Sequence, residues 1–163
     1  MTVSEYNICV RDYSDNIYRF VLKHIKNVEK AEDIVQDVFE KVWVKVEDIS
    51  FAKAKSYFFQ AAYRTMIDYI RKDARICYSE EIQSEQKSFQ KQTDLQEILN
   101  NALERLPQIQ QSAILLRDYE GYSYEEIGEI LSLNESQVKV YIFRARKNLR
   151  EYLRKIDYVL DER

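Results

Sequence analysis

The sequence predicts an all-α fold with two small helical domains joined by a linker, and three observations carry this prediction. Only two Gly and one Pro occur among the 163 residues, which leaves little material for hairpins and tight turns. Hydrophobic residues make up 45% of the chain, enough to bury a core, and they recur at helical spacing. That periodicity fails over residues 78–93, a polar stretch rich in Ser, Gln and Glu. We therefore expect domains at residues 1–77 and 94–163 with a linker between them.

The N-terminal domain is expected to contain three to four helices. Apolar residues recur at helical spacing nearly throughout residues 6–77. A long apolar stripe over residues 31–46 marks the second helix. After a short break at residues 47–51, a third helix is predicted over residues 52–74.

Outward faces of opposite charge are predicted on the second and third of these helices. The second helix turns Gln36 outward together with five acids, Glu29, Glu32, Asp33, Asp37 and Glu40. A charge run is usually only a solvated face, so the acidic face does not by itself indicate a partner. The third segment instead carries an excess of bases, namely Lys53, Lys55, Arg64, Arg71, Lys72 and Arg75.

Aromatic residues are interleaved with these bases. Exposed rings can stack on unpaired nucleic-acid bases while neighbouring cations hold the backbone, so the mixture suits single-stranded nucleic acid. We expect core positions for Phe58, Ala62 and Tyr69, and an exposed surface formed by Tyr57, Phe59, Tyr63 and Arg64. Aromatic residues at helical spacing more often belong to a core, and this alternative stays open for each ring.

The C-terminal domain is predicted to have four helices, the last two forming a helix-turn-helix over residues 124–149. Ser123 and Glu126 can cap the first helix of this pair, and Asn134 and Gln137 can cap the second. The second helix buries one stripe at steps of four, three and four residues, formed by Val138, Ile142, Ala145 and Leu149. This leaves exposed the positions Ser136, Gln137, Lys139, Val140, Phe143, Arg144, Arg146 and Lys147. Such a layout is typical of a helix-turn-helix that reads DNA.

Charge distribution favours this interpretation more than net charge does. The chain is acidic overall, with a formal charge of −3. Residues 118–129 hold five acids and no base, whereas residues 134–155 hold seven bases and two acids. This polarity can present one face to phosphates and repel them from the other. The alternative is a solvated amphipathic helix whose bases only balance nearby acids.

Other function classes are disfavoured by the residues present. His24 is the only histidine, no glycine-rich phosphate loop occurs, and neither Cys9 nor Cys77 has a His nearby, so no enzyme or cofactor is expected. The two cysteines lack metal-site spacing and suit reduced thiols, so no metal is expected. No signal peptide or apolar stretch of membrane-spanning length is visible, which predicts a cytoplasmic protein without direct membrane insertion.

Three motifs, in order, resemble those of bacterial sigma factors of the sigma-70 family. AEDIVQDVFEKVW at residues 31–43 looks like the segment that binds core RNA polymerase. KSYFFQAAYRTMIDYIRKDAR at residues 55–75 resembles the segment that opens promoter DNA. Residues 106–149, beginning LPQIQQSAILLRDYEGYSYEEIGEIL, resemble the C-terminal sigma domain. The order, the linker and the short length are similar to those of the extracytoplasmic-function group.

This resemblance implies a promoter-specificity subunit that binds core RNA polymerase, directs it to minus-thirty-five and minus-ten elements, helps melt promoter DNA, and is restrained by an anti-sigma factor. It implies core-polymerase binding by Asp33, Gln36, Asp37 and Glu40. Contacts to the minus-ten element are implied for Lys53, Lys55, Tyr57, Phe59, Tyr63, Arg64 and Arg71, with a flipped base held by the loop at residues 47–53. Contacts to the minus-thirty-five element are implied for Ser136, Lys139, Phe143, Arg144, Arg146 and Lys147.

Two features of the chain depart from the family pattern. Family members often carry Trp-Leu where this chain has Tyr57-Phe58, and Arg-Asn where it has Arg64-Thr65, so Thr65 is not assigned the role of the Asn. The competing hypothesis is a stand-alone helix-turn-helix regulator that binds palindromic duplex DNA and uses its N-terminal domain to sense a signal or dimerise. A helical adaptor without a DNA role would leave the basic helix unexplained.

Overall fold

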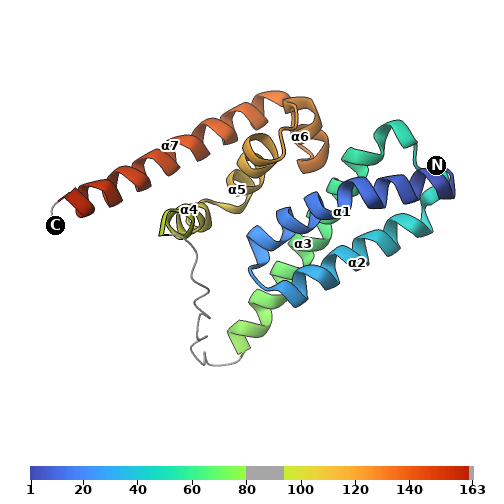
Figure 1. The fold of residues 1–163 in the computed structure, drawn as a ribbon, viewed down its shortest axis with the longest axis horizontal. Helices are drawn as coiled ribbons and strands as arrows, with labels where there is room; N and C mark the ends of the chain where they lie inside the picture. The colour runs from blue at the N-terminus through green and yellow to red at the C-terminus, as the bar shows by residue number, and fades with distance from the viewer. Residues whose placement is uncertain (80–93, 162–163) are drawn as a thin grey trace. The chain divides into compact units, whose positions relative to one another are not determined.

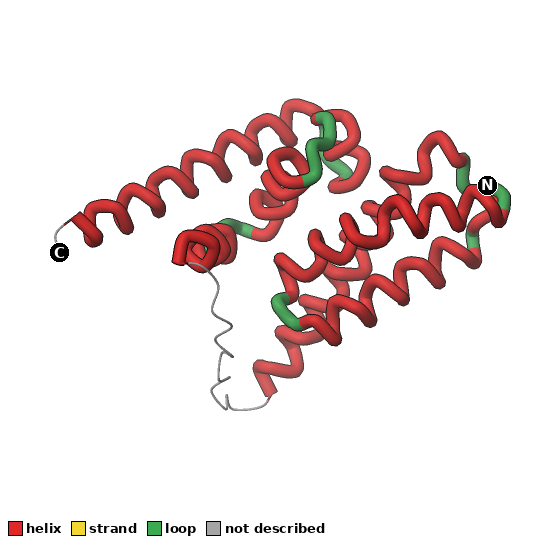
Figure 2. The backbone as a smooth tube through the Cα atoms, in the orientation of Figure 1, coloured by secondary structure: helices red, strands yellow, loops and turns green. Residues whose placement is uncertain are grey.

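The computed structural model describes residues 1–79 and 94–161, with side chains described over residues 1–76 and 95–156. Within these ranges every regular element is a helix, as Figures 1 and 2 show. The chain divides into two compact units, Met1–Glu85 and Gln86–Arg163. The prediction of an all-α protein with two helical domains is therefore confirmed. The expected linker at residues 78–93 lies almost entirely outside the described residues.

Three long helices form the N-terminal unit: α1 (Val3–Ile25), α2 (Val28–Val44) and α3 (Ala54–Ser79). The first two of these helices begin at capping residues. Thr2 and Glu5 make a reciprocal capping box on α1, and the Asn27 side chain caps α2. Lys26 stops α1 in the left-handed conformation, at a φ of 58°. Two short 3-10 turns, Val46–Asp48 and Phe51–Lys53, connect α2 to α3.

The core of this unit lies where α1, α2 and α3 pack against one another (Figure 1). Apolar side chains from all three helices are almost completely removed from water, among them Ile17, Phe20, Val38, Phe58, Phe59 and Met66. Burying large side chains of this kind stabilises the fold by roughly 1.5–3 kcal/mol each. Because α3 contacts both of the other helices, two sides of it are buried, not one.

The C-terminal unit contains α4 (Asp94–Glu104), α5 (Gln108–Ile114), α6 (Tyr124–Leu131) and α7 (Glu135–Asp161). Pro107 precedes α5, as its fixed φ and missing N–H allow. A π-helical segment, η3 (Leu115–Tyr119), continues α5 and ends before Gly121, whose φ is +73°. The four predicted helices of this domain are thus confirmed. No helix in the described part of the chain is both long and apolar enough to cross a bilayer.

The turn between α6 and α7 is closed by backbone hydrogen bonds. Ser132 adopts a left-handed conformation, at a φ of 59°, and the Leu133 N–H donates to the Gly128 carbonyl at 2.9 Å. This closure brings the Leu133 carbonyl so near α6 that a Cβ on Gly128 would lie 2.6 Å from its oxygen. A side chain at position 128 is therefore incompatible with the turn as it stands.

Both predicted helix caps of the helix-turn-helix are present. The Ser123 hydroxyl accepts a hydrogen bond from the Glu126 N–H at 3.1 Å. Asn134 and Gln137 exchange two hydrogen bonds, at 3.0 and 2.8 Å, in which each side chain accepts from the other residue's backbone N–H. These contacts fix where α6 and α7 begin and so set the register of the exposed positions on α7.

Candidate functional site

Helix α7 presents the predicted exposed face. Val138, Ile142 and Ala145 are buried against the rest of the unit, while Leu149 is half-buried. The positions predicted to be exposed are all exposed, from Ser136 and Lys139 to Arg144, Arg146 and Lys147. Phe143 keeps 64% of its surface exposed, which is unusual for a ring on a helix with such an apolar stripe on its other side. An exposed ring among cations is suited to contact with a thymine methyl group or a base face.

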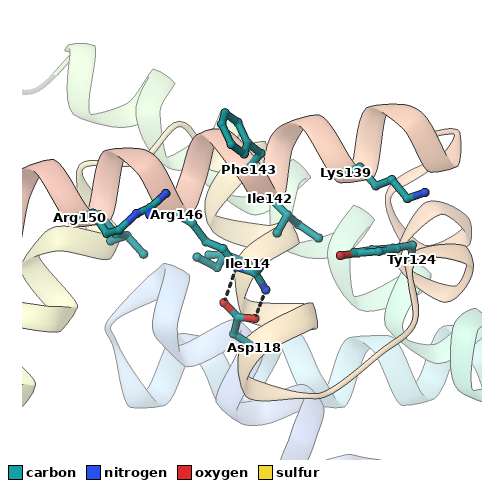
Figure 3. A pocket seen from close by; sticks show the side chains of 9 residues that line it. Ile114, Asp118, Tyr124, Lys139, Ile142, Phe143, Arg146 and Arg150 are labelled. Atoms are coloured by element: carbon teal, nitrogen blue, oxygen red, sulfur yellow. Dashed lines mark hydrogen bonds and ion pairs between the residues drawn. The ribbon is translucent and has the colours of Figure 1, made fainter.

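Two of the predicted DNA-contacting cations already have partners inside the C-terminal unit. The Arg146 guanidinium donates twice to the Asp118 carboxylate, from Nη2 to Oδ1 at 2.7 Å and from Nε to Oδ2 at 3.3 Å (Figure 3). Lys139 pairs with Glu135 at 3.2 Å, and its Nζ lies 5.6 Å from the centre of the Tyr124 ring. These contacts bias the orientation of both side chains before DNA binds.

Asp118 was missed as an interacting residue at the level of sequence. It falls in the acidic stretch 118–129, which the charge pattern interpreted as a face that repels phosphates. Its carboxylate is instead neutralised by Arg146, and this hydrogen bond is the main reason that the pKa of Arg146 is raised. The only sequence signal was the presence of bases on a helix of the same domain, and many bases share that property.

An open groove of about 730 Å³ lies beside this ion pair. Its apolar lining comes from Ile114, Ile142 and Leu149, and charged or aromatic side chains border it, namely Asp118, Tyr124, Lys139, Phe143, Arg146 and Arg150. Figure 3 shows the Arg146 side chain extending toward Asp118, while the Phe143 ring extends away from Asp118. Three cations of α7, namely Lys139, Arg146 and Arg150, therefore border this groove, whereas Arg144 and Lys147 do not line it.

On α2 the structure brings the predicted acidic face together along one side of the helix. Asp33, Gln36 and Glu40 are exposed, while the opposite side buries Ala31, Ile34, Val38 and Val42. Asp37 is half-buried and forms an ion pair with Lys41 at 2.8 Å. Three of the four predicted docking side chains are thus fully available on this surface, and the fourth is already engaged by a neighbour one turn away.

Helix α3 and the loop before it carry the second predicted nucleic-acid surface. Lys53, Arg64 and Arg71 are exposed, whereas Lys55, Tyr57 and Tyr63 are half-buried. Burial raises the pKa of the Tyr63 hydroxyl, which keeps this side chain neutral in the physiological range. The combination of cations and partly exposed rings is compatible with the mixture that the sequence predicted.

The predicted exposure of Phe59 is wrong. Its side chain is completely buried and its ring packs against Phe20, with 6.2 Å between ring centres. The cause is that α3 is packed on two sides, so the adjacent residues Phe58 and Phe59 both reach core positions. Phe58 contacts rings of α1 and α2, and Phe59 faces α1. Tyr69, predicted to be core, is in contrast only half-buried, with the Lys30 Nζ 5.7 Å from its ring.

Thr65 and Phe51 also take places that the sequence left open. Thr65 is buried, and its hydroxyl accepts a hydrogen bond from Lys41 at 3.4 Å, so it joins α3 to the acidic face of α2. Phe51 lies in the loop that follows α2 and keeps 43% of its surface exposed. Phe51 was not singled out at the level of sequence. Its position outside every apolar stripe could have predicted that its ring is exposed.

Comparison with known proteins identifies the two units. A Sigma-70 region 2 model matches residues 9–76, and a Sigma-70, region 4 model matches residues 96–149. The chain is 34% identical over 155 residues to the RNA polymerase sigma factor SigV of Bacillus subtilis (strain 168), covering 91% of each. It is 28% identical over 144 residues to the ECF RNA polymerase sigma factor SigM of the same organism, covering 85% of this chain and 88% of that protein.

A solved structure shows the same fold. The sigma factor RpoE, crystallised with the anti-sigma factor NepR from Bartonella quintana, matches 93% of this chain and 98% of its own, with a TM-score of 0.77 and 26% identity. The two helical units, each matched by a sigma-factor family model, define a two-domain transcription initiation factor. The chain belongs to the sigma-70 family of RNA polymerase sigma factors, in its extracytoplasmic-function group. It is a promoter-specificity subunit of RNA polymerase.

The resemblance drawn from three sequence motifs is therefore confirmed at the level of family and function. Among the described residues, no group of three or more His, Cys, Asp or Glu side chains could hold a metal ion.

Proposed function

We propose that the two domains of this sigma factor divide promoter recognition between them. In this proposal the C-terminal domain reads the minus-thirty-five element through α7, and the N-terminal domain holds and helps melt the minus-ten element. The observation that carries the proposal is the exposure of Phe143 and Arg144 in the N-terminal half of α7, on a helix whose register is fixed by the Asn134 cap. The same division supports domain boundaries at residues 1–77 and 94–163, with a linker at residues 78–93.

The acidic face of α2 is proposed to dock on core RNA polymerase. Exposed carboxylates and an amide, from Asp33, Gln36 and Glu40, are complementary to a basic helical partner and would speed its capture. Asp37 would take part after exchanging its contact with Lys41, because an ion pair whose two side chains both remain about half exposed contributes only about 0.2–1 kcal/mol.

The loop at residues 47–53 and the start of α3 are proposed to hold the minus-ten element. Pulling a base out of the stack costs a few kcal/mol, which stacking and electrostatic contacts must offset. Exposed Phe51 and half-buried Tyr57 and Tyr63 provide rings, while Lys53 and Arg64 provide charge for the backbone. Phe59 has no direct part in this surface, because it is completely buried.

An anti-sigma protein is proposed as a further partner. The support is that the RpoE structure, which matches 93% of this chain, was solved as a complex with the anti-sigma factor NepR. The protein is proposed to act in the cytoplasm, where polymerase and chromosomal DNA are present, and to carry no catalytic chemistry, cofactor or metal of its own.

Reconstituted transcription tests whether the two domains recognise different promoter elements. Purified core polymerase is combined with this protein on a genomic template library, and transcript starts are mapped. We expect new start sites that share two spaced elements. Arg144→Ala should weaken use of promoters with the upstream element intact, while Asp33→Ala should weaken core binding in a fluorescence titration.

Arg154→Ala is the matched control, because it removes an exposed base from the same helix beyond the region of the helix-turn-helix. Equal promoter use by the Arg144 variant and the wild type would overturn the assignment of α7. Tight binding of the protein alone to palindromic duplex DNA, without new starts from polymerase, would favour a stand-alone regulator instead.

A further inference from the structure

One ion pair joins the recognition helix to the segment that precedes α6. Arg146 on α7 and Asp118 on η3 are 28 residues apart, and two hydrogen bonds of 2.7 and 3.3 Å connect them. Paired donation from Nε and Nη2 to both carboxylate oxygens restricts the guanidinium in direction as well as distance. Such a contact holds an orientation that a single exposed Lys–Glu pair would not.

Arg146 also lies nearer to the buried stripe of α7 than Arg144 and Lys147 do. It follows the buried Ile142 by four residues, one helical turn, and therefore borders the buried stripe. Phe143 and Lys147, four residues apart, form the next row outward; Phe143 still lines the groove, whereas Lys147 does not. In Figure 3 the Arg146 side chain extends toward Asp118, while the Phe143 ring extends away from Asp118.

The negative charge of Asp118 also distinguishes Arg146 from the other bases of α7. An unpaired Asp118 close to the DNA-facing helix would repel phosphates, and the Arg146 guanidinium cancels this charge. Releasing Arg146 to a phosphate would expose the carboxylate again, so the gain from one new contact would be offset by the lost one. Neither Arg144 nor Lys147 has an acidic partner within ion-pair distance among the described side chains.

We infer that Arg146 is a positioning residue that does not touch DNA: through Asp118, on the η3 continuation of α5, it fixes the angle of α7 against α5, so that Ser136, Val140, Phe143, Arg144 and Lys147 form the face that reads the promoter. This inference rests on the proposed role of α7 in reading the upstream element. It changes the assignment that the family resemblance implies for Arg146, and it adds Asp118 as the residue through which Arg146 acts.

The salt dependence of promoter binding separates positioning from phosphate contact. The probe is a promoter duplex whose start site has been mapped with the wild-type holoenzyme, and its association constant is measured by competition over a range of salt concentrations. Each phosphate contact contributes about 0.9 to the slope of log K against log salt. The double variant Asp118→Asn/Arg146→Gln removes both charges and leaves the net charge unchanged. We expect it to keep the wild-type slope and to lower the affinity about threefold.

Lys147→Gln is the matched control, because this base lies one residue further on α7 and on the outward row. It should lower the slope by about 0.9. A similar drop in the Asp118→Asn/Arg146→Gln variant would overturn the inference, since it would place Arg146 on a phosphate. A higher affinity in Asp118→Asn alone would also overturn it, because that result would mean that the carboxylate competes with DNA for Arg146.

The charge swap Asp118→Arg/Arg146→Asp gives an independent test. If the pair only positions α7, the swap restores the contact in reverse, and promoter affinity should return to within about twofold of wild type. If Arg146 contacts DNA, the swap places a carboxylate against phosphates, and affinity falls below that of Arg146→Gln. Thermal melting of each full-length variant reports whether it is folded. A wild-type protein that gives no promoter-specific starts would contradict the proposed function itself, a result distinct from failure of the swap.

Discussion

Replacing Gly128 by Ala tests whether the turn of the helix-turn-helix depends on a missing side chain. In an exposed helix the change would add about 1 kcal/mol of stability, because Ala has the higher helix propensity. Here the new Cβ would lie 2.6 Å from the Leu133 carbonyl oxygen, and 3.8 Å from a methyl group of Val138. The distance between the new Cβ and this oxygen would be about 0.7 Å shorter than an ordinary C···O contact of about 3.3 Å.

The group that would have to move is the Leu133 backbone carbonyl, and the surrounding backbone holds it in place. The Leu133 N–H donates to the Gly128 carbonyl at 2.9 Å, and the next residue, Asn134, caps α7. Overpacking of this kind costs about 1–3 kcal/mol, and a rigid neighbour puts the cost at the upper end. After subtracting the propensity gain, the variant should lose about 2 kcal/mol, which corresponds to about 10 °C in the melting temperature of a domain of this size.

Hydrogen exchange of α6 and α7 amides in the full-length protein measures this loss within the C-terminal domain. Gly121→Ala provides a comparison, because no atom lies within 4 Å of its added Cβ and only the φ of +73° opposes it, at about 1–2 kcal/mol. Promoter binding should weaken in the Gly128 variant while core binding by the N-terminal domain is retained. A Gly128→Ala protein as stable as the wild type, or more so, would refute the steric argument.

Three further predictions follow from burial and exposure. Phe59→Ala should destabilise the N-terminal domain by about 3–5 kcal/mol in denaturant unfolding, because the ring is completely buried; a change below 1 kcal/mol would contradict its core position. Phe143→Ala should leave unfolding unchanged but lower promoter affinity by about 1–2 kcal/mol in a competition assay, because the ring is 64% exposed; equal affinity would remove Phe143 from the DNA surface. Burial lowers the pKa of His24 from 6.5 to about 4, so the unfolded chain binds the proton more readily between these values and stability should fall as pH drops through that window. The loss is at most about 3 kcal/mol; chemical unfolding at pH 7 and pH 4.5 measures it, and His24→Gln should flatten the profile.

Local patterns were sufficient for much of the fold. Capping by Ser123 and by Asn134 with Gln137 depends on residues three positions apart, so it can be seen in the sequence and is present in the structure. The buried stripe of α7 likewise follows from a period of 3.6 residues, which needs no knowledge of what packs on it. The acidic face of α2 was found for the same reason.

Contacts between distant segments were beyond such patterns. Periodicity gives a helix one buried side, but it does not say how many neighbours will cover that helix, so Phe59 was placed on the surface. Lys41 and Thr65 are 24 residues apart, and their contact depends on how α2 crosses α3. The assignment of a residue to a DNA surface is equally sensitive, because it depends on which side of the helix remains uncovered.

The sequence by itself determined the family, the two helical domains and the helix proposed to read DNA, because these depend on motif order, helical periodicity and caps formed between neighbours in the chain. Only the tertiary structure decided which bases on that helix are available for contact with DNA. Arg144, Arg146 and Lys147 are equivalent in a list of exposed positions, but packing of α7 on α5 brings Asp118 within 2.7 Å of Arg146, the one of these three bases that pairs with it. The physical reason is that a side chain's partner is set by its three-dimensional neighbourhood, and the sequence does not show which side chain 28 positions away will be that neighbour.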